Sequence, residues 1–291
     1  MTQIKIYPLL TGEVRIDRAL AHQTRTRLGP LAATGWFRGD EHKYWAPVPA
    51  HLIDAGDALV LVDTGWHETI RENPLRALNR LALSMYQGRQ QPGQELPAQL
   101  ARLGYALDDI THVVMTHLHS DHASGLSYLE GSQAPIYLGP GEWREANLSP
   151  FYIKHMFRRA LNYRTVGYDP ITGVAGFERG HDLLGDERIL LLPTPGHTHG
   201  HQSVLIRSKK DVLLTADIAY DRQALEEQVL PGSLSAPPKA RASLANVRAF
   251  AEANPNAILQ FGHDPHTWGA TGRAILALHG DTSESHADRA A

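Results

Sequence analysis

The sequence predicts two stacked β-sheets with helices on their outer faces, in an α/β (α+β) domain. Apolar strand-like runs followed by helical stretches occur in the first half of the chain and again in the second, an order typical of sheets covered by helices. No linker divides the halves, and 291 residues with 42% hydrophobic content can bury a substantial core. We therefore expect one domain over residues 1–281 and a disordered polar tail over residues 282–291.

Composition limits the classes of function. The formal net charge is −3 and no basic run exceeds Lys209-Lys210, which argues against binding to nucleic acid or to an anionic membrane. The first residues lack the apolar core of a signal peptide, and no stretch of about 18 apolar residues occurs, so a cytoplasmic location is expected. The chain has no cysteine, which excludes disulfides, thiolate ligands and a cysteine nucleophile.

The first sheet is predicted to begin with two hairpins. Alternating apolar and polar residues indicate paired strands, at residues 3–10 and 13–18 and again at residues 48–53 and 58–62. Between the hairpins, glycine and proline break residues 19–45 into an irregular loop. Its aromatic residues, Trp36, Phe37, Tyr44 and Trp45, either line a pocket or pin the loop to the core.

The elements that follow alternate between helix and strand. Periodicity and stop signals predict a helix followed by a mobile loop within residues 66–93. They predict further helices at residues 96–103, 141–146, 152–163 and 240–253. Short apolar runs predict buried strands at residues 112–115, 135–138, 188–192, 203–206, 212–215 and 257–261.

One motif carries most of the chemistry. His117, His119, Asp121 and His122 follow the predicted strand at 112–115 and precede Gly125, where a helix can begin. Imidazole and carboxylate groups suit zinc and its neighbours. Because His117 and His119 alternate along the chain, they point the same way, while Asp121 and His122 face a position a few ångströms further on. This spacing indicates two metal ions rather than one.

Three further candidate ligands, His197, Asp217 and His263, each come just after an apolar strand. Strand ends can converge at one rim of a sandwich, and the candidates then divide into two sets with Asp217 bridging them. The sets are His117, His119 and His197 on one metal, and Asp121, His122 and His263 on the other. Asp63 also follows an apolar strand; its carboxylate either hydrogen-bonds the ligand loop from behind or caps the next turn. Histidines without a motif are expected to be surface or packing residues, namely His22, His42, His155, His181, His279 and His286.

With these residues in this order, the chain resembles the metallo-β-lactamase superfamily. The pattern His-x-His-x-Asp-His, followed by His, Asp and His at strand ends, is met between Asp63 and His263. The resemblance implies an αββα sandwich of two mixed β-sheets flanked by helices, with two divalent metal ions at one edge. Zinc is the first expectation for these ions, and cobalt, manganese or iron are the alternatives. The lack of cysteine and the presence of Asp217 differ from true β-lactamases, and His119 stands where di-iron flavoprotein relatives carry glutamate.

Tyr220 narrows the resemblance to the N-acyl homoserine lactonases, the quorum-quenching lactonases. It lies three residues after Asp217, and a tyrosine at that offset in those enzymes faces the substrate carbonyl or ring oxygen. A phenol there can donate a hydrogen bond to an oxyanion; the alternative is a tyrosine that packs for shape alone. By the family pattern His197 is the ligand of its loop, His199 lies outside the site, and His201 supports the ligands from behind.

The resemblance implies a hydrolase that opens lactone rings. A hydroxide bridging two metals would attack the lactone carbonyl, Tyr220 would stabilise the oxyanion, and Asp121 would pass a proton to the leaving ring oxygen. Eight apolar or aromatic residues could form the wall of an acyl pocket, namely Trp36, Phe37, Met85, Tyr86, Phe151, Tyr152, Met156 and Phe157. A hydrophobic core would use the same residue types.

Other functions remain open at this point. The nearest alternative is a thioesterase of the glyoxalase II type or an arylesterase, and a second is an iron-dependent persulfide dioxygenase. A phosphodiesterase acting on nucleic acid and a non-catalytic metal-binding protein are less well matched. The expected partner is a small lactone, and the chain is expected to form a homodimer, the commonest soluble oligomer.

Overall fold

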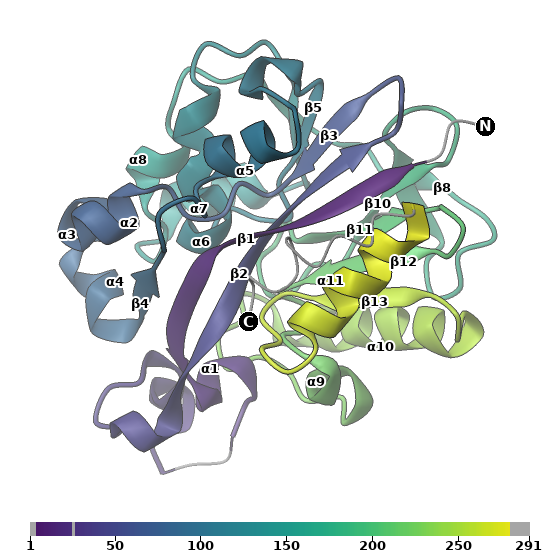
Figure 1. Cartoon of the computed structure of the whole chain (residues 1–291). Helices are drawn as coiled ribbons and strands as arrows, with labels where there is room; N and C mark the ends of the chain where they lie inside the picture. The colour runs from purple at the N-terminus through teal and green to yellow at the C-terminus, as the bar shows by residue number, and fades with distance from the viewer. Residues whose placement is uncertain (1–3, 25–26, 280–291) are drawn as a thin grey trace.

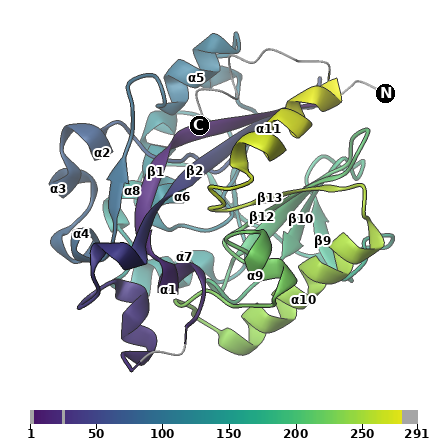
Figure 2. The ribbon, with the colours of Figure 1, turned by 60° about the horizontal axis from the view of Figure 1, so that its bottom comes forward.

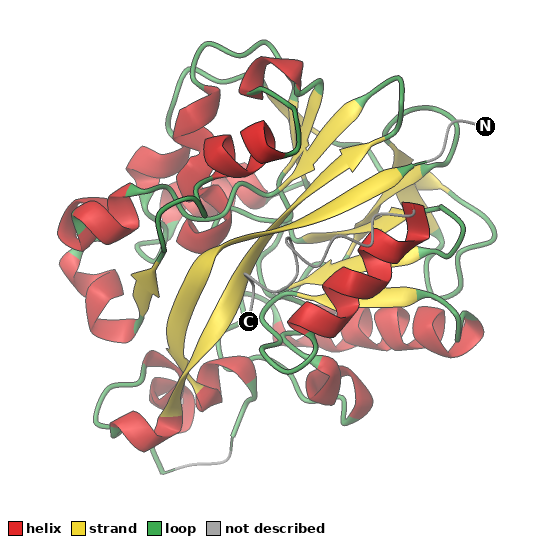
Figure 3. Cartoon of the chain, viewed as in Figure 1, coloured by secondary structure: helices red, strands yellow, loops and turns green. Residues whose placement is uncertain are grey.

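The computed structural model describes residues 4–24 and 27–279 and has four layers, in the order helices, sheet, sheet, helices (Figure 1). Figure 3 shows the strands of the two sheets in the middle of the molecule with helices on both sides. The predicted αββα sandwich of two mixed sheets is therefore confirmed. The tail predicted for residues 282–291 and His286 lie outside the described residues. Within the described part of the chain, no helix has the length and apolar character needed to cross a membrane.

The first sheet has seven strands in the order β4-β1-β2-β3-β5-β6-β7. β4, β1, β2 and β3 pair antiparallel, whereas β3, β5, β6 and β7 pair in parallel, so the sheet is mixed. The hairpin predicted for residues 48–53 and 58–62 is confirmed by the pairing of β2 with β3. The strands are β1 (Lys5–Asp17), β2 (Lys43–Asp54), β3 (Leu59–Val62), β4 (Gln87–Arg89), β5 (His112–Val114), β6 (Ile136–Leu138) and β7 (Tyr163–Thr165).

The hairpin predicted for residues 3–18 is wrong, because β1 is one long strand. Residues on both sides of Thr11 pair with β2, and the register shifts between Leu10 and Glu13. The buried hydroxyl of Thr11 donates a hydrogen bond to the Val48 carbonyl on β2, at 2.8 Å. The residues that resemble a turn in the sequence therefore form a bulge that stays within the sheet.

The second sheet has six strands in the order β13-β12-β11-β10-β9-β8. Only the β12–β13 pair is parallel; the other pairs in this sheet are antiparallel. The short strands β8 and β9 were not predicted. The strands are β8 (Asp169–Pro170), β9 (Arg179–Asp182), β10 (Ile189–Pro193), β11 (Gln202–Ile206), β12 (Val212–Ala216) and β13 (Ile258–Phe261).

Alternation along the strands fills three apolar layers. On β3, Leu61 packs beneath the helices of the first half, whereas Val60 packs between the sheets against Leu191 of β10. On β10, Leu190 faces away from the first sheet and packs with Phe250 of α10. Figure 2 shows α10 along the second sheet, on the side away from α2, α3 and α4. Both faces of each sheet are thus buried, as their continuous apolar runs require.

The helices are mostly short. Those of the first half are α1 (Arg18–Ala21), α2 (Thr69–Glu72), α3 (Pro74–Ala77), α4 (Arg80–Met85), α5 (Leu96–Arg102), α6 (Ser120–Ala123), α7 (Glu142–Leu148) and α8 (Lys154–Phe157). Those of the second half are α9 (Arg222–Glu226), α10 (Pro237–Ala253) and α11 (Trp268–Leu276). Short 3-10 helices are η1 (Gly29–Thr34), η2 (Asp40–His42), η3 (Leu107–Asp109), η4 (Ser124–Leu129) and η5 (Ala277–His279).

Three predicted helices are wrong in extent. The helix expected from residue 66 is divided into α2, α3 and α4, because Asn73 and Asn79 cap new helix starts with their side chains, and the expected mobile loop contains β4. The helix expected at residues 152–163 is only α8, since Tyr163 must extend to pair with Ile136 of β6. The helix expected from Gly125 begins earlier, at Ser120.

Candidate metal centre

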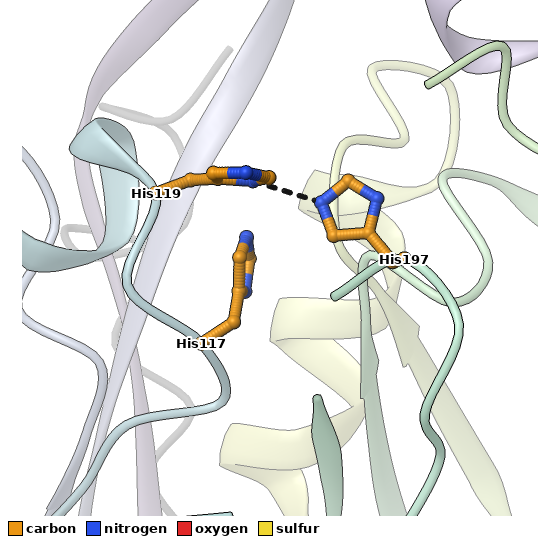
Figure 4. A group of neighbouring side chains, drawn as sticks. All are labelled: His117, His119 and His197. Carbon is orange, nitrogen blue, oxygen red and sulfur yellow. Dashed lines mark hydrogen bonds between the residues drawn. The ribbon is translucent and has the colours of Figure 1, made fainter. Parts of the chain in front are cut away.

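The candidate ligands lie where strands of both sheets end. His117 and His119 follow β5, and Asp121 and His122 lie on α6 directly after them. The other three candidate ligands come from the second sheet. His197 lies on the loop after β10, Asp217 directly follows β12, and His263 is the second residue after β13. Figure 4 shows His117 and His119 on one loop facing His197 on another.

The structure brings all of these side chains together in three overlapping groups. The groups are His117, His119 and His197; His117, His122 and Asp217; and Asp121, His122 and His263, and within each the ligand atoms lie within 4.8 Å of one another. The first and third groups coincide with the two sets expected from the sequence.

Asp217 lies between the two sets. Its Oδ2 is 3.6 Å from Nε2 of His197 and 3.4 Å from Nε2 of His263. Its Oδ1 is 3.3 Å from Nε2 of His122. One carboxylate thus faces imidazoles of both sets, as a bridging ligand would.

The hydrogen bonding of the cluster fits metal ions. Buried polar atoms are normally hydrogen-bonded, yet among the described residues three converging atoms of this cluster have no partner, namely His117 Nε2, His122 Nε2 and Asp217 Oδ1. His119 Nδ1 and His197 Nε2 also lie only 2.9 Å apart. Nitrogen and carboxylate oxygen atoms that converge without hydrogen-bond partners are a donor set suited to zinc or a similar divalent ion.

The directions of the pKa shifts of His117, His197 and Asp217 agree with ligand roles. Burial lowers the pKa of His117 and His197 well below that of an ordinary histidine, and the neighbouring imidazoles lower it further. Both side chains are therefore neutral, which is the form that binds metal. Burial opposes ionisation of Asp217, but His263 and His122 hold its pKa well below the ordinary range.

Asp63 supports the cluster from behind. Its Oδ2 is 2.8 Å from Nδ1 of His122 and accepts the Thr116 hydroxyl at 2.8 Å, while Oδ1 accepts the Thr116 N–H, also at 2.8 Å. Of the two roles expected for Asp63, the structure shows contact with the ligand loop. A proton on Nδ1 of His122 leaves Nε2 free to face Asp217.

His201 and Pro47 form hydrogen bonds with two of the candidate ligands, Asp217 and His263. His201 Nε2 accepts the backbone N–H of Asp217 at 3.1 Å, so His201 contacts a candidate ligand without facing the cluster centre itself. His263 places Nδ1 2.8 Å from the Pro47 carbonyl, which leaves Nε2 as the nitrogen aimed at the carboxylates. His199 is half exposed and bonds Glu145, outside the cluster.

Two strained backbone positions lie beside the candidate ligands. Asp63 and Ala216 adopt positive φ values of 56° and 48°, which are unfavourable for residues with a Cβ. The loop of His263 also approaches Asp217 so closely that a Cβ on Gly262 would lie 2.7 Å from Asp217 Oδ1. These positions lie where the strand ends that carry the candidate ligands come together.

Tyr220 closes one side of the cluster. Its ring lies 5.0 Å from that of His263, and the side chain is buried. Burial and the nearby carboxylates of Asp217 and Asp121 raise the pKa of Tyr220 well above its ordinary value. The phenol therefore keeps its proton and can act as a hydrogen-bond donor.

A cavity of about 380 Å³ opens from the cluster. Its polar end is formed by His119, Ser120, Asp121, His197, Asp217, Tyr220 and His263. Its other walls are mainly apolar, and they include Val14, Ile16, Leu20, Leu31, Ala33, Met85, Tyr86, Phe151 and Leu234. The arrangement can hold a molecule with a polar reacting group and an apolar tail.

Only part of the predicted apolar wall lines this cavity. Met85, Tyr86 and Phe151 do. Phe37 instead points to solvent with 89% of its surface exposed, and the Trp36 indole donates a hydrogen bond to Ser84. The remaining three predicted wall residues are buried in the core, namely Tyr152, Met156 and Phe157. Five of the eight residues predicted for the pocket wall, namely Trp36, Phe37, Tyr152, Met156 and Phe157, therefore do not line this cavity.

Comparison with known proteins decides the family. The sequence model described as the Metallo-beta-lactamase superfamily matches residues 44–263. The chain belongs to this superfamily. It is 28% identical to an N-acyl homoserine lactonase of Bacillus cereus over 279 residues, which cover 91% of this chain and 94% of the relative. It is 27% identical to an N-acyl homoserine lactonase of Rhizobium radiobacter over 282 residues, covering 92% and 96%.

A solved metallo-β-lactamase-fold structure is similar over the same length. It is an N-acyl homoserine lactone hydrolase with the product N-hexanoyl-L-homoserine bound at its catalytic metal centre. It matches with a TM-score of 0.74 and 25% identity, covering 90% of this chain and 94% of that one.

The superfamily pattern made the ligands visible in the sequence, but other residues of the site were missed. Val14 and Ile16 of β1 line the cavity, and only their alternation in a strand could have indicated a shared face. Ser120 also lines it from inside the ligand motif, with its hydroxyl 2.8 Å from that of Tyr86. Buried Glu142, discussed below, has no sequence signal.

Proposed function

We propose that this metallo-β-lactamase-superfamily hydrolase opens the lactone ring of N-acyl homoserine lactones. The observation that carries the proposal is the cavity, which joins the His/Asp cluster and Tyr220 at one end to apolar walls at the other. An acyl homoserine lactone has the matching division, with a polar ring next to an apolar chain. The similarity to relatives named as lactonases supports the same substrate class.

The cluster is proposed to hold two divalent metal ions, zinc in the first instance. One would take His117, His119 and His197, the other Asp121, His122 and His263, with Asp217 shared. When bound, such ions lower the pKa of water toward neutrality and polarise an ester carbonyl.

The chain's own residues supply orientation and proton transfer. Tyr220 keeps its proton and lines the cavity, so its hydroxyl can donate to the oxygen of the carbonyl as negative charge develops there. Asp121 is the more accessible carboxylate, with 15% of its side chain exposed against 3% for Asp217. It can therefore receive a proton and deliver it to the departing ring oxygen. The apolar walls hold the acyl chain and exclude water.

The test combines metal analysis with hydrolysis of a short-chain and a long-chain acyl homoserine lactone. The expected result is about two metal ions per chain, as a dinuclear site requires, with turnover of the lactones. Asp217→Asn should lower both metal content and turnover, because it removes the shared ligand. Two metals with faster turnover of thioesters or aryl esters than of lactones would overturn the lactonase assignment, and a single iron with redox activity would overturn hydrolysis.

A further inference from the structure

Glu142, the first residue of α7, is a fully buried carboxylate outside the metal cluster. The partners that the structure gives it are uncharged. Its Oε1 accepts the Leu118 N–H at 2.8 Å and its Oε2 accepts the Thr198 hydroxyl at 2.5 Å. The backbone of Gly200 also bonds the carboxylate. A buried carboxylate without a cation is costly, so its retention calls for a physical reason.

The hydrogen-bond partners of Glu142 indicate why a buried carboxylate is present at this position. Leu118 stands between His117 and His119, and Thr198 follows His197. One carboxylate therefore joins the two loops that carry the first ligand set, and these loops come from different sheets. The Tyr152 hydroxyl lies 3.4 Å from Oε1, and the Tyr152 ring lies 4.8 Å from the ring of His119.

The two loops approach α7 closely. A Cβ on Gly200 would lie 2.4 Å from the Glu142 Cβ and 2.6 Å from the Gly139 carbonyl oxygen. Only glycine allows this contact, since a real side chain would displace the loop. The short separation is what brings the Glu142 carboxylate within hydrogen-bond distance of Thr198.

The bonding pattern requires a carboxylate rather than a side chain of the same shape. Leu118, Thr198 and Gly200 all present donors, and an ionised carboxylate offers only acceptors. A glutamine has one acceptor oxygen, and its NH₂ group would face one of these donors. Burial raises the pKa of Glu142 to about 7, whereas the hydrogen bonds from Thr198, Leu118 and Gly200 favour the charged form.

We propose that Glu142 is a positioning residue of the metal centre. Through Leu118 and Thr198 it holds the loop of His117 and His119 at a fixed separation from the loop of His197. The inference rests on the metal-binding part of the proposed function and does not depend on the identity of the substrate.

The experiment measures zinc affinity by competition with a chromophoric chelator, without substrate. Glu142→Gln is expected to weaken zinc binding by about 10- to 100-fold, as for other residues that orient metal ligands. The visible spectrum of the cobalt-loaded variant should change, since the ligand geometry changes. The matched control is Glu145→Gln on the same helix. The hydrogen bonds of Glu145 go to His199, on the loop of His197, and to Ser235, and none goes to the loop of His117 and His119. Glu145 therefore does not join the two loops, and this control should keep the wild-type affinity and spectrum.

A second variant separates positioning from general stability. Thr198→Val removes one hydrogen bond to Glu142 with little change in shape, and it should weaken zinc binding in the same direction even if Glu142→Gln fails to fold. Unchanged zinc affinity and an unchanged cobalt spectrum in folded Glu142→Gln, or in Thr198→Val, would overturn the inference while leaving the proposed function intact. A wild-type chain that binds no metal would overturn both.

Discussion

Replacing His51 by leucine is expected to make the fold less sensitive to acid. His51 lies on β2 with 5% of its surface exposed, and its Nε2 has no hydrogen-bond partner among the described residues. Its ring lies 6.3 Å from that of Trp268, measured between ring centres. Burial lowers the pKa of His51 from 6.5 to about 3. In the folded protein the ring therefore stays neutral at a pH where the unfolded chain binds a proton.

The sign and size follow from this difference in pKa. As the pH falls from 6.5 toward about 3, the unfolded chain gains a proton at His51 that the folded chain does not, so stability is lost. The loss is about 1.4 kcal/mol per pH unit, or about 2 kcal/mol at about pH 5. Above the unfolded-state pKa of 6.5, His51 is neutral in both the folded and the unfolded chain, so it causes no loss of stability there.

Urea unfolding of the metal-loaded protein at about pH 7.5 and about pH 5 measures the effect. The fall in the free energy of unfolding between the two pH values should be about 2 kcal/mol smaller in His51→Leu than in the wild type. His42→Leu is the control, because His42 is 43% exposed, and it should keep the wild-type dependence. If His51→Leu also kept the wild-type dependence, the assignment of acid sensitivity to His51 would be refuted.

Three further outcomes are expected. Tyr220→Phe should lower kcat for lactone hydrolysis by about 10²- to 10³-fold with unchanged metal content; an unchanged kcat would mean that the phenol serves only for packing. Asp63→Asn should weaken zinc binding by about 10- to 100-fold in a chelator competition, because the carboxylate that orients His122 is lost. Phe151→Ala should raise KM for long-chain more than for short-chain lactones, whereas Trp36→Ala should not, since only Phe151 lines the cavity; an equal effect of both would contradict the assignment of the acyl wall.

The ligand positions could be predicted because each follows an apolar strand. In a two-sheet sandwich the strand ends can meet at one rim, so local context predicts His197, Asp217 and His263 near the first motif, and the superfamily pattern selects the same residues. The same local logic gave the strands β2, β3 and β5 and the helix α10. Where a residue's role depends on the strand directly before it, sequence is sufficient.

The remaining features depend on contacts between distant segments. Thr11 resembles part of a turn until its hydroxyl is seen bonded to Val48 on the neighbouring strand. Tyr152 and Phe157 looked available for a pocket, but packing beneath the first sheet buries them. Glu142 gives no local signal, because its partners Leu118 and Thr198 come from two different loops. Periodicity carries no information about which apolar residue meets a cavity and which meets the core.

The division of the ligands between the two sheets has a consequence during synthesis. A ribosome delivers His117, His119, Asp121 and His122 together, but the chain must grow through β10, β12 and finally β13 before His197, Asp217 and His263 exist. A nascent chain halted after η4 would hold the first motif with no second sheet to complete it. The full set of candidate ligands is therefore complete only late in synthesis, after both halves of the chain have been made.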